Sequence, residues 1–178
     1  MPSRAERACR LGRAAAVGAV LAVLLPSSLR AGGDDGTNGL DAMLPGFGEV
    51  RIAVIEQPDA SPPTAEIVLQ GTDGQPIYRF PPLPGSDSWA YVGTDGLRLA
   101  DIDGDGQQDL VAVVEMATGI GPGGAEPFKA GAVYLRRANG FEADRKLDEK
   151  LNEPPLRDQW SDAATLAEVA GKIAAPGR

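Results

Sequence analysis

The sequence predicts a mainly β domain that ends in a helix. Short β-branched and apolar runs recur between residues 49 and 137, and Gly/Pro-rich turns separate them. The apolar pattern changes to helical spacing in residues 161–174. The 178 residues are enough for a single domain with its own hydrophobic core.

The first 31 residues have the pattern of a secretory signal peptide. Residues 1–13 contain four arginines, residues 14–25 are uncharged and apolar, and small residues follow up to Ala31. A membrane span needs roughly 20 apolar residues, more than this run of 12. We therefore expect residues 1–31 to be removed on export, which would place the protein in the periplasm or outside the cell. A retained N-terminal anchor is the alternative.

The composition of the remaining chain limits its chemistry. The sequence has a single cysteine, Cys9, which lies in the predicted signal peptide, so the remaining chain has none. The sequence has no histidine. Disulfides therefore cannot stabilise the exported domain, which must depend on packing or on a bound metal. The lack of histidine removes the commonest general base and transition-metal ligand, and it excludes a Ser-His-Asp triad.

The charge of the chain is strongly acidic. The formal net charge is −8, and residues 1–31 contribute +4 through five arginines and one glutamate, which leaves −12 for the rest. Such a charge disfavours binding to nucleic acid or to anionic membranes and favours cations or basic partners. The same charge keeps an exported protein soluble, so it does not by itself identify a partner.

The first half of the exported chain predicts a lead-in followed by strands. Residues 32–47 are rich in Gly and Asp and lack periodicity, so we expect a flexible lead-in before a single domain over residues 48–178. A turn "GTDG" joins two of the predicted strands in a hairpin. The predicted strands of this half are residues 49–56, 64–70, 75–80 and 88–93.

The second half predicts three more strands around two loops. Residues 97–100 and 109–116 flank an acidic loop, and the nearly continuous apolar run of 109–116 is typical of a strand buried on both faces. A Gly/Pro-rich loop leads to another predicted strand at 130–137. Its segment "GIGPGG", residues 119–124, has the spacing G-x-G-x-x-G, but Pro122 interrupts it and no helix follows. We therefore expect a turn-rich recognition loop rather than a dinucleotide site.

The C-terminal region predicts helices. Leu147 and Leu151 lie four residues apart and indicate one or two helical turns. Residues 161–174 predict a longer helix with Ser161 as its N-cap. Its apolar stripe is expected to dock on the sheet and consists of Leu166, Val169, Ala170 and Ile173.

The acidic loop "DIDGDGQQDL", residues 101–110, predicts a cation site. Alternate residues of a straight strand lie about 6.6 Å apart, whereas Ca²⁺ needs oxygens within about 2.6 Å of its centre. The segment must therefore curl, and Gly104 and Gly106 permit this. An all-oxygen donor set favours a hard cation, and Ca²⁺ accepts more protein ligands than Mg²⁺ does. The expected ligands are Asp101, Asp103, Asp105, the main-chain carbonyl of Gln107, and Asp109. An Asp/Gly turn without an ion is the alternative.

The loop does not fit the EF-hand pattern. With Asp101 as position 1, Gly106 occupies position 6 as required, but Ala112 stands where position 12 needs a bidentate glutamate. The loop also continues into an apolar strand rather than a helix. The stretch "LADIDGDGQQDLVAVV" instead resembles the calcium loop D-x-D-x-D-G-x-x-D-L of FG-GAP/VCBS repeats, the blade motif of integrin-type β-propellers. Residues 131–142, "GAVYLRRANGFE", resemble the strand and turn that follow it in those repeats.

The resemblance implies a partial propeller. The motif occurs once, and the Phe-Gly and Gly-Ala-Pro signatures around it are missing. Because a closed propeller needs at least four blades, we expect a small open antiparallel sheet or sheets of one to two propeller-like blades. Loops and the C-terminal helix would cover their edges. Small exported proteins with solitary VCBS-like repeats, including periplasmic lysozyme-inhibitor-like ones, use calcium structurally and act by binding proteins.

An enzymatic function is not expected. The loop carboxylates are too close and too alike in environment to act as separate acid and base. Glu56, Glu66 and Glu115 lie on predicted strands without an obvious partner carboxylate. A hydrolase that uses paired carboxylates is the lesser alternative.

A carbohydrate-binding or cell-surface-binding module is a further alternative. An exposed row of aromatic rings near Trp89 would favour such a module. We expect instead that Trp89, Tyr91 and Tyr134 belong to the core. The sequence does not predict the oligomeric state or the identity of a partner.

Overall fold

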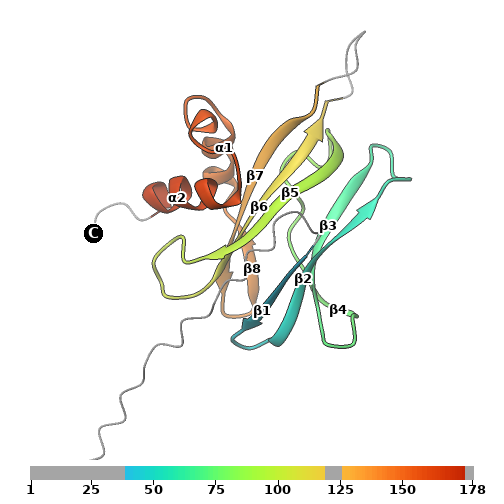
Figure 1. Ribbon diagram of the computed structural model, residues 1–178, viewed down its shortest axis with the longest axis vertical. Helices are drawn as coiled ribbons and strands as arrows, with labels where there is room; N and C mark the ends of the chain where they lie inside the picture. The colour runs from blue at the N-terminus through green and yellow to red at the C-terminus, as the bar shows by residue number, and fades with distance from the viewer. Residues whose placement is uncertain (1–38, 119–125, 175–178) are drawn as a thin grey trace, which may run out of the picture. The chain divides into compact units, whose positions relative to one another are not determined.

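The computed structural model describes residues 39–118 and 126–174 (Figure 1). The predicted signal peptide 1–31, the first part of the lead-in and the segment 119–124 lie outside the described residues. The described part is mainly β, as predicted, with two small open antiparallel sheets and a C-terminal helix. Within residues 39–118 and 126–174, no helix combines the length and apolar character needed to cross a membrane.

Each sheet has four strands that follow one another in sequence order. Every neighbouring pair is antiparallel, so each sheet is a simple meander with the strand number of a propeller blade. The first sheet consists of β1 (Gly39–Leu44), β2 (Gly48–Gln57), β3 (Thr64–Gln70) and β4 (Pro76–Arg79). The second sheet consists of β5 (Ala90–Ala100), β6 (Asp109–Ala117), β7 (Phe128–Arg137) and β8 (Gly140–Ala143).

Strand β6 shows how the core is divided. Its side chains alternate between the two faces of the second sheet because successive residues of a strand point to opposite sides. Leu110, Ala112 and Val114 join a buried cluster with residues of the first sheet, whereas Val111 and Val113 join a second cluster with the helices. The prediction that residues 109–116 are buried on both faces is confirmed.

The helices cover the outer face of the second sheet. They are α1 (Arg145–Asn152), the short 3₁₀ helix η1 (Arg157–Gln159) and α2 (Ala163–Ala174). Figure 1 shows α1 and α2 on the same side of β6 and β7, and Leu166 and Ala170 of α2 are fully buried there. The predicted docking of the C-terminal helix on the sheet is therefore confirmed.

Part of the predicted lead-in is ordered. Residues 39–47 form β1 and a turn, so the prediction of a flexible lead-in up to residue 47 is wrong for this part. Strand β1 pairs with β2 along its whole length, from Gly39 opposite Ala53 to Leu44 opposite Gly48, and Leu44 is buried. Pairing with a strong neighbouring strand overrides the Gly- and Asp-rich composition.

The other boundaries differ from the prediction in three places. The expected strands 88–93 and 97–100 form the single strand β5, which takes up the intervening residues through two register shifts. The short strand β8 was predicted only as a turn and an aromatic residue. Helix α2 begins at Ala163 rather than 161, because Asp162 caps it: its carboxylate accepts the N–H of Thr165 at 2.9 Å.

Helix α1 supplies the missing partner for one edge of β7. Strand β8 pairs only with Tyr134–Arg137, so the earlier part of β7 has no strand on that side. Asn152 accepts the N–H of Gly131 at 2.8 Å and donates to its carbonyl at 2.7 Å, and Asp148 accepts the N–H of Val133 at 2.8 Å. Two side chains one helical turn apart therefore protect an open sheet edge.

Arg136 connects the two sheets. It lies on β7, is 5% exposed, and donates to the carbonyl of Pro45 in the β1–β2 turn at 2.9 Å. Its guanidinium carbon lies 4.8 Å from the ring centre of Phe47 and 5.1 Å from that of Phe141. These hydrogen-bond and cation–π contacts hold the first sheet against the second.

Candidate metal site

The acidic loop joins β5 to β6 and curls at its two glycines. Ala100 and Asp109 face each other across the strand pair, so residues 101–108 form the connection. Gly104 has φ 76° and Gly106 has φ 85°, in the left-handed region that other residues avoid. The curl expected from the sequence is therefore present.

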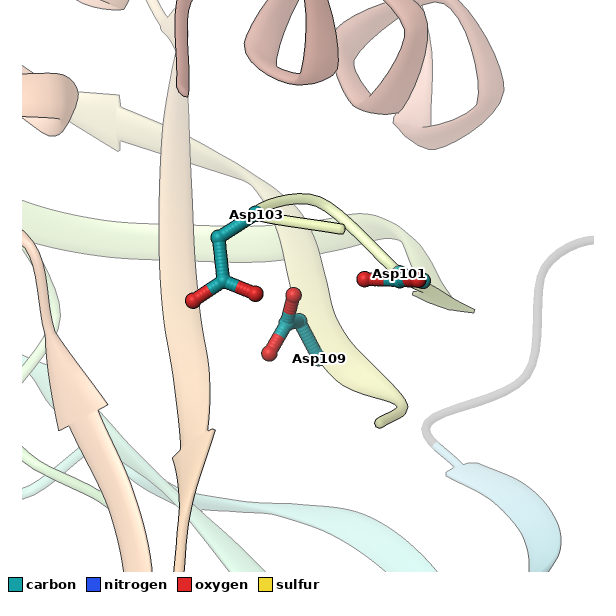
Figure 2. A group of neighbouring side chains, drawn as sticks. All are labelled: Asp101, Asp103 and Asp109. Carbon is teal, nitrogen blue, oxygen red and sulfur yellow. The ribbon is translucent and has the colours of Figure 1, made fainter. Parts of the chain in front are cut away.

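Three of the predicted ligands meet in this loop. Asp101, Asp103 and Asp109 each offer a carboxylate oxygen, and these oxygens lie within 4.8 Å of one another. Figure 2 shows the three carboxylates facing a common space beside β6. Two ligands on opposite sides of a Ca²⁺ ion, each about 2.4 Å from its centre, would lie about 4.8 Å apart. The cluster can hold a metal ion, and its donors are all oxygens.

The three carboxylates differ in burial and in their hydrogen bonds. Asp101 is exposed and accepts the N–H groups of Gly104 at 2.7 Å and Gly106 at 3.1 Å. Asp103 is half-buried and accepts from the guanidinium of Arg137 at 3.0 Å. Asp101 therefore shapes the curl of the loop, and Asp103 is the carboxylate that already forms an ion pair with Arg137.

Asp109 is fully buried and ties the loop to the neighbouring strand. Its Oδ2 accepts the N–H of Ile102 at 2.7 Å, and its Oδ1 accepts the N–H of Arg136 on β7 at 2.6 Å. Burial raises the pKa of Asp109, and these two N–H donors act in the opposite direction. Asp109 is thus both a candidate ligand and a structural link from the loop to β7.

Arg137 supplies a positive charge to the cluster. Its hydrogen bond to Asp103 is the main cause that raises the pKa of the guanidinium. A second carboxylate, that of Glu142, lies 3.5 Å from its Nε atom. A metal ion in the cluster would therefore either share the carboxylate of Asp103 with Arg137 or displace the guanidinium of Arg137 from it.

Asp105, also predicted as a ligand, lies outside the three-carboxylate group, and the main-chain carbonyl of Gln107 stays a prediction. The carboxylate of Asp105 accepts the main-chain N–H and the side-chain amide of Gln107, both at 2.8 Å. The main-chain hydrogen bond is the largest cause that lowers the pKa of Asp105. The D-x-D-x-D spacing describes ligands and turn-forming aspartates alike, since an aspartate readily accepts the N–H two residues further on.

Sequence reasoning missed Arg136 and Arg137 as parts of this site. Both belong to β7, and they reach the loop because Leu110 of β6 lies opposite Tyr134 of β7. No local pattern in the sequence indicates this register. The pairing of the two strands therefore decides which β7 residues surround the cluster.

The aromatic residues near β5 and β7 divide between core and surface. Tyr91 and Tyr134 are buried, as expected. Trp89 is half-buried and makes an edge-to-face contact with Phe128, with ring centres 5.0 Å apart. Trp89 and Phe128 are both half-buried and pack against the core cluster, so the described residues place a pair of rings, rather than a row, at the surface near β5.

Comparison with known proteins adds no assignment. The chain matches no protein-family model, no curated protein and no solved structure. The geometry of the loop and its surroundings is therefore the basis for the functional proposal.

Proposed function

We propose that the protein is an exported calcium-binding β-domain that acts by binding another protein, as an inhibitor or a similar recognition module. The observation that carries this proposal is the convergence of Asp101, Asp103 and Asp109 on a curled loop with oxygen donors. The resemblance of the loop to FG-GAP/VCBS repeats favours Ca²⁺ over other hard cations. The N-terminal pattern of residues 1–31 supports export.

The role proposed for calcium is structural. Asp109 accepts the main-chain N–H of Arg136, and the side chain of Arg136 reaches the first sheet through Pro45. An ion in the loop would neutralise the repulsion between carboxylates and stabilise this connection. Asp105 would join the ligand set only if its hydrogen bonds to the main-chain N–H and side-chain amide of Gln107 rearranged, whereas the main-chain carbonyl of Gln107 takes no part in those bonds.

A non-enzymatic role fits the loop better than catalysis. The cluster oxygens lie within 4.8 Å of each other, whereas the two carboxyl groups of a glycosidase are about 5–9.5 Å apart. Asp109 is held in place by two main-chain N–H groups, one on each oxygen, which suits a structural role. The burial of Tyr91 and Tyr134 supports a protein-binding role over a carbohydrate-binding one.

Calcium binding is tested by calorimetric titration and by thermal unfolding with calcium or with a chelator. We expect binding with a Kd of about 10⁻⁴–10⁻³ M and a gain of about 2.7 kcal/mol at a hundredfold excess over Kd. Asp101→Asn with Asp103→Asn should abolish both effects. Asp73→Asn is the matched control, because Asp73 also holds a turn by accepting an N–H, that of Gln75 at 3.0 Å.

The absence of both heat and stabilisation in the unmutated protein would refute the calcium site. The protein-binding half is tested separately, by capture from periplasmic extract followed by titration of each captured protein in purified form. Failure of every purified candidate to bind would contradict the recognition role while leaving calcium binding intact.

A further inference from the structure

A second candidate site lies away from the acidic loop. A cavity of about 400 Å³ lies between the segment that joins β4 to β5 and helix α1. Its apolar wall includes Leu83, Pro84 and Trp89. Asp148 and Asn152 of α1, which cap the edge of β7, also line it. The cavity therefore combines an aromatic wall with polar groups held in place by the sheet.

The aromatic wall is fixed in position. A Cβ atom at Gly85 would lie 2.1 Å from a ring atom of Trp89, so the indole rests directly on the glycine backbone, whose φ is 69°. The main-chain N–H of Trp89 donates to the carbonyl of Gly85 at 2.7 Å, and the ring of Phe128 contacts the indole edge-to-face. The ring needs little reorganisation to receive a ligand.

The carboxylate of Asp148 has one oxygen left for a ligand. The residue is 7% exposed, and its Oδ1 accepts the N–H of Val133 at 2.8 Å. Its Oδ2 accepts no hydrogen bond within residues 39–118 and 126–174. Because the residue is largely buried while Oδ2 is not among the buried atoms, this oxygen is open to the cavity, where a cationic hydrogen-bond donor would stabilise the poorly solvated charge.

The charged residues around the cavity favour a positively charged ligand. Asp87, Asp148 and Glu149 line it with negative charge, and Arg145 is the one basic residue of the described lining. Carboxylates beside an indole ring suit a guanidinium or an ammonium group, which the ring attracts by cation–π interaction and the carboxylates by charge-assisted hydrogen bonds. The acidic net charge of the chain would steer such a group towards the site.

We propose that this cavity binds a basic side chain, arginine or lysine, of the protein partner. The inference rests on the proposed function in one respect, namely that the cation belongs to a protein. It does not depend on calcium, because none of the cavity residues belongs to the acidic loop.

The two tryptophans of the chain allow a direct test by NMR with N-acetyl-L-arginine amide as the probe. The indole N–H of Trp89 should shift and saturate with a Kd of about 1 mM. That of Trp160, which is buried and donates to the carbonyl of Leu151 at 2.9 Å, should not move. The citrulline analogue has the same shape without the charge, so we expect it to bind at least tenfold more weakly.

Two variants locate the binding. Asp148→Asn keeps an oxygen that accepts the N–H of Val133 but removes the charge, and should weaken binding at least tenfold at pH 8. If this variant does not fold, Asp87→Asn with Glu149→Gln removes two exposed cavity charges and should weaken binding several-fold. Glu49→Gln removes one negative charge, as Asp148→Asn does, but from β2, outside the cavity lining, and should leave binding unchanged.

Binding should also weaken from pH 8 to pH 5.5, because burial raises the pKa of Asp148 to about 7. The other charges near it are Asp144, Arg145 and Glu149 of the α1 region and Asp87 of the opposite wall. Of these, Asp144 and Glu149 raise the pKa of Asp148 and Arg145 lowers it. Tyr134 of β7, whose pKa is raised mainly by burial, stays neutral across this range.

Several results would overturn the inference. They are a Trp89 signal that does not move, equal binding of the citrulline analogue, and unchanged affinity in both cavity variants. Spermidine binding more tightly than the arginine probe would assign the cavity to a free polyamine instead of a protein side chain. All titrations are repeated with calcium and with chelator, so failure of this site is distinguished from failure of the calcium site.

Discussion

Asp109 and Asp148 cap opposite edges of the same strand with the same chemistry. Asp109 accepts the N–H of Arg136 on the side of β7 that faces β6, and Asp148 accepts the N–H of Val133 on the side that faces β8. Both side chains are buried, and burial raises the pKa of each. The two residues therefore make the same hydrogen bond to β7, and any difference in their chemistry comes from the other groups around each carboxylate.

The difference lies in how many donors each carboxylate receives. Asp109 has an N–H on each oxygen and lies beside two further aspartates, so a shared cation would relieve the repulsion between the three carboxylates. Asp148 has a donor on one oxygen, and its pKa rises to about 7. The first environment suits a structural metal ligand, and the second suits a site that receives a cationic group from outside.

The largest expected effect is that of Asp109→Ala. This variant leaves the N–H groups of Ile102 and Arg136 buried without an acceptor, at about 1–3 kcal/mol each. We expect a loss of about 3–5 kcal/mol in the free energy of unfolding, measured by urea denaturation in chelator. Asp148→Ala is the comparison. It should lower the free energy of unfolding by less, since it leaves only one N–H group, that of Val133, without an acceptor. Equal losses would show that the number of donors does not distinguish the two residues.

The next effect is a pH dependence that belongs to Asp148. The folded-state pKa of about 7 exceeds the usual 3.8, so the folded protein binds the proton more tightly than the unfolded chain does. The stabilising contribution is therefore present at low pH and is lost as the pH rises through 7. We expect the free energy of unfolding to fall by about 2–3 kcal/mol between pH 5 and pH 8.

Asp148→Asn tests the origin of that slope. The amide keeps an acceptor for the N–H of Val133 and does not titrate, so most of the decrease between pH 5 and pH 8 should disappear in urea denaturation. An unchanged slope in the variant would assign the pH dependence to other groups.

The smallest effect on stability, and a sharper one on calcium, is expected from Arg137→Gln. Its ion pair with Asp103 is part-exposed, with side-chain exposures of 42% and 21%, so stability should change by less than about 1 kcal/mol. Because the guanidinium competes for Asp103, its removal should tighten calcium binding several-fold in a calorimetric titration. Arg51→Gln removes a similar exposed pair with Asp41 on the first sheet and serves as the control. A weaker calcium affinity in Arg137→Gln would show that Arg137 supports the site.

Local patterns in the sequence predicted the parts whose cause is local. The curl of the acidic loop follows from Gly104 and Gly106, which reach dihedrals that side-chain-bearing residues avoid. The burial of β6 on both faces follows from its unbroken apolar run, and the docking of α2 follows from the spacing of Leu166 and Ala170. The strands β2, β3 and β7 were predicted to within two residues at each end.

The parts that were missed depend on partners distant in sequence. Strand β1 forms from residues with little strand character because β2 offers a complete set of hydrogen bonds. Residues 90–100 form one strand because pairing with β6 absorbs the turn-like "GTDG" of residues 93–96 as bulges. The short β8 extends the sheet because β7 offers it a free edge. A hydrogen-bonding edge outweighs a weak local preference.

The sequence by itself determined that oxygen ligands would crowd the 101–109 loop of a mainly β domain, because the residue types and their spacing are local facts. The tertiary structure decided which of those carboxylates converge: Asp109 joins Asp101 and Asp103, whereas Asp105 pairs with Gln107. It alone brought Arg137 to the cluster and α1 to the open edge of β7. The reason is that strand register and helix docking are set by burial and by long-range hydrogen bonds, which no short stretch of sequence contains.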